Sequence, residues 1–107
     1  MKKNLIILKI VRDNLFNELG EKILDVILFG SRTGKHSNPD SDFDILIIIN
    51  GSLTWQEKNK IRSICYDISL DQDILIDSKI VTKQEIETSF WGKHPMIVDA
   101  ILNGIHA

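Results

Sequence analysis

The chain has 107 residues, which is the length of one domain. Its 43% hydrophobic and 26% charged residues are typical of a globular protein and exclude a disordered chain, a collagen-like repeat and a multidomain enzyme. The longest apolar runs, residues 5–8 and 45–49, fall far short of the roughly 18 residues that a membrane span requires. We therefore expect a single domain over residues 1–107 that does not enter a membrane.

The charge balance argues against a long DNA or RNA partner. Thirteen basic and 15 acidic side chains give a formal charge of −2, whereas binders of long DNA or RNA are usually basic. The single cysteine, Cys65, cannot form an internal disulfide and behaves as a small buried hydrophobe in a reduced compartment. The basic N-terminus resembles a signal peptide, but Lys9 interrupts its apolar stretch and no cleavage site follows. A cytoplasmic location is expected.

The first half of the chain predicts a helix, a strand, a loop and a second strand. Residues 5–19 carry apolar side chains at steps of three and four, which indicates an amphipathic helix, and Gly20 stands where a C-cap belongs. Residues 23–29 form a short apolar run that is typical of a buried strand. Turn-forming residues dominate 30–41. Residues 42–50 predict a strand whose later half is apolar on both faces, so it is central in a sheet.

Two capping boxes mark helices in the second half. Thr54 with Glu57 opens a helix that runs through residue 68, and Thr82 with Glu85 opens a short helix. Between these helices, residues 73–81 predict a third strand.

A last helix begins at Pro95 and is closed by Gly104. The resulting order predicts an α/β domain with a small mixed three-stranded sheet flanked by about four helices. The long helical connection makes strands two and three parallel through a right-handed crossover. The shorter connection between strands one and two permits an antiparallel pair.

Two carboxylates stand at the start of the second strand. Asp42 and Asp44 share one face of a strand, roughly 7 Å apart along the backbone. They repel each other, and a hard divalent cation with oxygen ligands resolves that repulsion. An Asp-x-Asp pair alone is more often a solvated strand entrance, so the neighbouring residues decide its meaning.

A glycine and a serine follow the first strand directly. Gly30 lets the backbone approach a ligand, and the Ser31 hydroxyl with nearby N–H groups can bind a phosphate. Arg32 and Lys35 add positive charge beside the turn. If strands one and two are antiparallel, this turn meets the acid pair at one edge. A phosphate-binding turn beside a metal-binding acid pair is typical of enzymes that transfer phosphoryl or nucleotidyl groups.

Residues 28–32 and 41–45, LFGSR and SDFDI, resemble the signature of the DNA polymerase β-type nucleotidyltransferase superfamily. Within it the chain is similar to the minimal nucleotidyltransferases (MNT) of HEPN/MNT toxin–antitoxin modules. The glycine-serine pair, the ten-residue gap and the Asp-x-Asp all match. One departure is Gly34, which comes three positions after Ser31 instead of the family's four. This offset leaves the nucleotide-binding roles of Arg32 and Lys35 open.

The resemblance implies a third carboxylate on the next strand, with Asp71, Asp73 and Asp77 as candidates. Asp73 begins the apolar run Ile74 to Ile76, and the start of a parallel third strand lies beside the start of the second. Asp77 would lie about 13 Å further along the strand. We therefore expect Asp73 to be the third acid, with Asp71 and Asp77 as alternatives.

The resemblance also implies a mechanism and partners. Asp42, Asp44 and Asp73 would be the catalytic residues and would hold two Mg²⁺ ions, with Mn²⁺ as the alternative, while Gly30 and Ser31 would hold the leaving phosphates. ATP would donate AMP, or another nucleoside triphosphate its own nucleoside monophosphate, to a tyrosine of a HEPN toxin and so silence the toxin.

Two other functions stay open. The chain could be a non-catalytic antitoxin that neutralises its partner by contact, through an apolar C-terminal stripe that could equally be core. The stripe consists of Phe90, Met96, Ile97, Ala100 and Ile101. Alternatively, the chain could be a nucleotidyltransferase that acts on an antibiotic. The nucleobase, the acceptor and the oligomeric state are not determined by the sequence.

Overall fold

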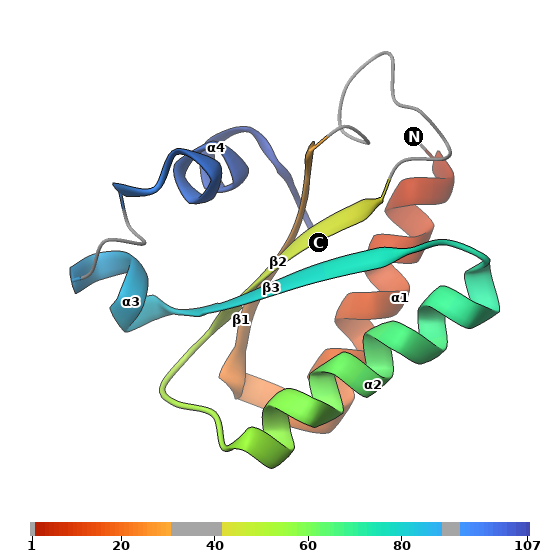
Figure 1. Ribbon diagram of the computed structural model, residues 1–107, viewed down its shortest axis with the longest axis horizontal. Helices are drawn as coiled ribbons and strands as arrows, with labels where there is room; N and C mark the ends of the chain where they lie inside the picture. The colour runs from red at the N-terminus through yellow and green to blue at the C-terminus, as the bar shows by residue number, and fades with distance from the viewer. Residues whose placement is uncertain (1, 31–41, 89–92) are drawn as a thin grey trace.

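A computed structural model describes residues 2–30, 42–88 and 93–107 (Figure 1). The helices are α1 (Lys2–Leu19), α2 (Trp55–Gln72), α3 (Lys83–Thr88) and α4 (Pro95–Asn103), with a 3-10 turn, η1, at Gly20–Lys22. The strands are β1 (Ile23–Phe29), β2 (Phe43–Ile49), β3 (Ile76–Thr82) and β4 (Ile105–His106).

The described strands form one mixed sheet in the order β3-β2-β1-β4. β1 pairs antiparallel with β2, and β2 pairs parallel with β3 across the α2 connection, as the sequence predicts. The prediction of three strands is wrong, because the two-residue β4 pairs antiparallel with Ile27 and Leu28 of β1. So short a strand has no periodicity of its own by which the sequence could reveal it.

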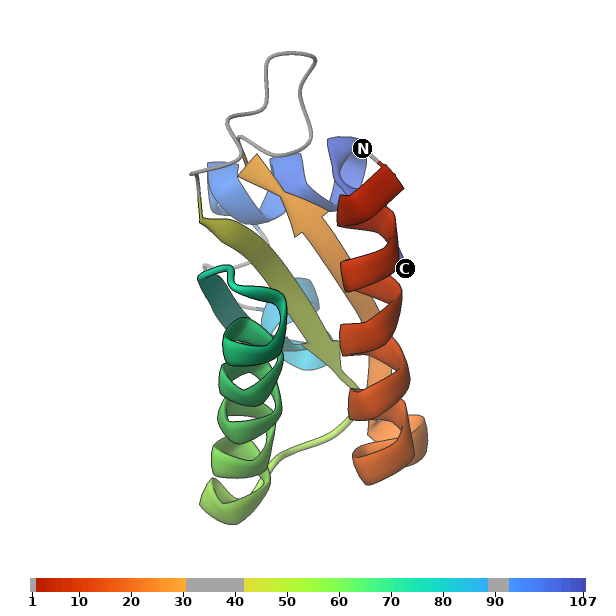
Figure 2. The same cartoon turned by 90° about the vertical axis from the view of Figure 1, so that its right-hand side faces the viewer.

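Helices cover both faces of the sheet. Figure 2 shows α1 and α2 side by side across one face, with α4 behind the sheet. On the α1/α2 face the core gathers side chains from both helices and both central strands, among them Val11, Leu28, Phe43 and Ile61. On the other face Ile97 and Ala100 of α4 pack with Ile27, Phe29, Leu46 and Val81. Burial on both faces explains the continuous apolar runs over residues 26–29 of β1 and 45–49 of β2.

The C-terminal stripe belongs to the core. Ile97 and Ala100 are buried, and Met96 and Ile101 pack against them. The remaining stripe residue, Phe90, lies outside the described residues. The core interpretation of the four described positions is therefore confirmed.

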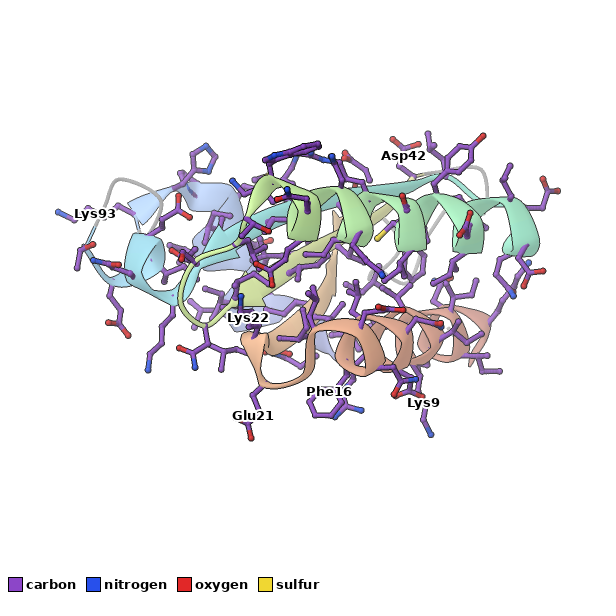
Figure 3. The ribbon with its side chains drawn as sticks, turned by 90° about the horizontal axis from the view of Figure 1, so that it is seen from below. Lys9, Phe16, Glu21, Lys22, Asp42 and Lys93 are labelled. Carbon is purple, nitrogen blue, oxygen red and sulfur yellow. The ribbon has the colours of Figure 1, made fainter. Side chains whose placement is uncertain are left out.

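Local capping interactions set the helix starts. At α2, Glu57 N–H donates to Thr54 Oγ1 at 3.1 Å and Thr54 N–H donates to Glu57 Oε1 at 2.9 Å. Thr82 and Glu85 make the same reciprocal pair before α3, at 3.0 Å each. Both predicted capping boxes are confirmed. Lys22 also binds Glu57, with Nζ 2.8 Å from Oε2, and so ties η1 to the start of α2; Figure 3 labels Lys22 there.

The α2–β3 connection differs from the predicted one. The prediction ends the helix near residue 68 and starts the strand at Asp73, but α2 continues to Gln72. Asp73 is its C-cap, in the left-handed conformation with φ 53° and ψ 48°, and its N–H donates to Ser69 O. β3 therefore begins only at Ile76. This three-residue shift decides which acid reaches the site.

Two further features of the described residues bear on function. Burial raises the pKa of the Cys65 thiol to about 11, so it stays protonated and inert, as the sequence predicts. Among the described residues, none of the helices has the length and apolar character needed to cross a membrane.

Candidate active site

The site is built where β1 ends and β2 begins. The antiparallel register places Phe29 opposite Asp44, so Gly30 follows directly beside that carboxylate. Gly30 has φ +81°, and a Cβ at this position would lie 2.5 Å from Asp44 Oδ2. Glycine is required here for two reasons, the left-handed backbone and the space that the carboxylate occupies. The predicted convergence of Gly30 with the acid pair is confirmed.

A third carboxylate comes from β3. The parallel register pairs Asp44 with Asp77, and one oxygen of each of Asp42, Asp44 and Asp77 lies within 4.8 Å of the others. We call these three residues the acid cluster. Asp42 is exposed and Asp44 half-buried. In Figure 3 Asp42 projects from the side of the molecule opposite to the exposed α1 face that carries Lys9 and Phe16.

Strand alternation explains why the cluster faces α4. Side chains two apart on a strand share a face. Asp44 is therefore on the face of Leu46, and Asp77 on that of Val81, both of which pack with α4. The register and the alternation together bring the two carboxylates to one side of the sheet.

The acid cluster is electrostatically strained. Burial, then the charges of Asp77 and Asp42, raise the pKa of Asp44 above its ordinary value, while Lys79 acts in the opposite direction. Lys79 comes from the same face of β3, with Nζ 4.0 Å from Asp77 Oδ2. Three oxygen donors that repel one another are the donor set that a hard divalent cation satisfies. The described residues thus fit a divalent metal.

Asp73 does not join this cluster. The predicted third strand starts at Asp73, but the helix C-cap occupies that position and Asp77 pairs with Asp44 instead. The placement of Asp73 beside the pair is wrong, and Asp71 lies within α2. The helical spacing of Ile61, Cys65 and Ile68 stops at residue 68, so it gives no signal for the later start of the strand at Ile76.

Three predicted nucleotide-binding residues are not described by the structure. Ser31, Arg32 and Lys35 fall within residues 31–41, outside the described part of the chain, so their nucleotide-binding roles remain predictions.

Lys79 is the residue beside the acid cluster that the sequence did not predict. It carries no motif, and only the register of β3 places it beside the acid cluster.

Comparison with known proteins gives concordant results. The family model described as "Polymerase beta, Nucleotidyltransferase" matches residues 13–97. A protein of Methanocaldococcus jannaschii with the provisional name protein adenylyltransferase is 40% identical over 84 residues, which is 78% of this chain and 84% of the relative. A crystal structure of the toxin-antitoxin MntA-HpeT, in mutant form, superposes with a TM-score of 0.55 over 96% of this chain and 70% of that chain. At 17% identity the last likeness is one of fold.

Proposed function

The chain belongs to the polymerase β-type nucleotidyltransferase family, an enzyme family that transfers nucleotides, and on this premise we propose that it adenylylates a protein. It would move AMP from ATP to a hydroxyl of its partner, a tyrosine of a HEPN toxin, and so act as the antitoxin. The observation that carries this proposal is the acid cluster beside Gly30, at the motif that defines the family resemblance.

Divalent metal ions would be held by the acid cluster, with Mg²⁺ as the proposed ion and Mn²⁺ as the alternative. When bound, two such ions would supply charge stabilisation of the attacking and leaving oxygens. The fit rests on the donor set, because three carboxylates gathered within 4.8 Å repel one another unless a cation joins them.

The chain's own residues have separate proposed tasks. Gly30 leaves room for the Asp44 carboxylate and, with Ser31, would bind the leaving phosphates. The acceptor oxygen forms a bond to the α-phosphorus, and the bond from that phosphorus to the bridging oxygen breaks. Pyrophosphate leaves with the electron pair, and the hydroxyl proton passes to the Asp77 carboxylate. We thus assign to Asp77 the third-acid role that the sequence resemblance assigned to Asp73.

Support for a protein acceptor comes from the relatives. The provisional name of the Methanocaldococcus jannaschii relative is protein adenylyltransferase, and the alignment covers most of both chains. The structural neighbour is part of a toxin-antitoxin pair.

The test is transfer of AMP to the protein encoded by the adjacent reading frame. The wild type is incubated with that protein, Mg²⁺ and ATP labelled on the α-phosphate, and labelled protein is measured. We expect Asp77→Asn to lower the rate at least about a hundredfold, because it removes a metal-holding carboxylate. Asp73→Asn is the matched control and should keep the rate within about threefold, since Asp73 caps a helix instead.

The other outcomes identify the alternatives. Loss of transfer in Asp73→Asn but not in Asp77→Asn would restore the sequence-based assignment. If the wild type transfers nothing, and the double variant Asp42→Asn/Asp44→Asn still neutralises the toxin, the chain is a binding module. Labelling of an aminoglycoside in place of the protein would indicate a small-molecule acceptor.

A further inference from the structure

β3 forms one edge of the sheet, because it pairs with β2 on one side only in the described part of the chain (Figure 1). An edge strand presents unpaired backbone N–H and C=O groups to which an extended segment can add. The same strand carries Asp77 of the acid cluster. The exposed edge and the site are therefore continuous.

The backbone groups that face outward can be identified. Phe43 N–H donates to Leu75 O at 2.7 Å, so Leu75 turns its carbonyl toward β2. In a parallel ladder, successive residues turn their backbone groups alternately to the two sides. The groups of Asp77, Lys79 and Val81 therefore face β2. Those of the even-numbered residues, Ile76 to Thr82, face away from it.

At each end of this edge a side chain occupies the outward N–H group, and we call these the closed ends. Ile76 N–H donates to Ser69 Oγ at 3.2 Å, and Thr82 N–H donates to Glu85 Oε1 at 3.0 Å. Between them, Ser78 and Ile80 present backbone N–H and C=O groups with no partner among the described residues. The open edge is thus one short window, centred on Lys79.

We propose that this window binds an extended segment of the protein acceptor as an added strand, an inference that rests on the proposed adenylylation. Strands pair about 4.8 Å apart, and paired residues direct their side chains to the same face. A segment hydrogen-bonded to Ser78 and Ile80 therefore carries a residue opposite Asp77, on the face of the acid cluster. A hydroxyl-bearing side chain at that position is delivered to the site by backbone pairing.

A second copy of this chain fits the window poorly. Two β3 edges paired antiparallel about the window would set Lys79 directly opposite Lys79, and like charges in that position destabilise a sheet. The closed ends also limit pairing to the residues between Ile76 and Thr82. The window suits a short segment of a different protein.

The test replaces Ile80 with proline, which removes an outward N–H and leaves the ladder to β2 intact. Ile80→Ala is the matched control, since it shortens the same side chain and keeps the N–H. With the protein of the adjacent reading frame as acceptor, we expect Ile80→Pro to lower kcat/KM for that protein about tenfold. Ile80→Ala should stay within about threefold, and KM for ATP should be unchanged in both.

The outcomes separate the two proposals. No transfer by the wild type overturns the proposed function. Transfer that is equal in the wild type and Ile80→Pro overturns only the added strand. If Ile80→Pro does not fold, hydrogen exchange on the wild type decides, because the acceptor must protect the amides of Ser78 and Ile80. Absence of that protection, or a dimer that Ile80→Pro converts to a monomer, overturns the inference.

Discussion

Replacing Asp44 with asparagine should stabilise the metal-free protein while it removes a residue of the proposed site. The amide keeps the shape of the side chain and deletes its charge. At a separation of 4.8 Å, two unit charges repel by about 0.9 kcal/mol in a water-like dielectric. The substitution removes two such repulsions, from Asp42 and Asp77, and it also removes the attraction between Asp44 and Lys79. The net gain should be about 1 kcal/mol, or roughly 4 °C in Tm for a domain of this size.

The assay is thermal unfolding at pH 7 in EDTA, with Asp67→Asn as the control. Asp67 is exposed on α2 and lies outside the acid cluster, so the same chemical change there should alter stability by less than about 0.5 kcal/mol. Addition of Mg²⁺ and ATP should then raise Tm of the wild type more than that of Asp44→Asn. A metal-free Asp44→Asn that is no more stable than Asp67→Asn would refute the reasoning.

The stability gained by Asp44→Asn should depend on pH. Since burial and neighbouring carboxylates raise the pKa of Asp44, the fold disfavours its charged form. That penalty is fully present above the folded-state pKa and disappears as pH falls below the unfolded-state value of 3.8. The advantage of Asp44→Asn over the wild type should therefore shrink as pH is lowered from 7 towards 4. An advantage that grows on acidification would contradict this account.

Two further predictions concern the glycine and the C-terminal strand. Gly30→Ala should lower the free energy of unfolding by about 1–2 kcal/mol because of its left-handed φ of +81°, as measured by denaturant unfolding. It should also displace the Asp44 carboxylate and so weaken the binding of Mg²⁺-ATP. Unchanged binding would show that Gly30 is not part of the site. His106 contacts Asp25 through Nδ1, and this hydrogen bond raises the pKa of His106. Its stabilisation is complete below the unfolded-state pKa of 6.5 and is lost as pH rises through the higher folded-state value, so the Tm difference between wild type and His106→Gln should narrow from pH 6 to pH 8. A constant difference would assign the effect to packing.

The sequence predicted most of the sheet because its strongest signals are local. Residues 23–29 match β1, and both capping boxes lie where Thr54 and Thr82 place them. The pairing of Gly30 with the Asp-x-Asp followed from one antiparallel connection. These features depend on neighbours in the chain or on a single loop, so pattern alone was enough.

The third acid could not be predicted in the same way. Its identity depends on where α2 ends, and helix ends are set by backbone conformations such as the left-handed Asp73. It depends also on the register of β3 against β2, which is a tertiary property. Lys79 enters the site through that register too. An error of three residues in a strand start was enough to exchange Asp77 for Asp73.

The cover that α4 provides for one face of the sheet has a consequence for biosynthesis. The strands β1, β2 and β3, which place Gly30, Asp44 and Asp77, are synthesised well before α4 and β4. Until residues 95–106 have emerged from the ribosome, the sheet face that α4 covers, with Phe29 and Leu46, has no helix α4 to bury it. A nascent chain at this stage presents an apolar surface to chaperones and to other nascent chains. Completion of the last helix is therefore the step that turns an assembled site into a closed domain.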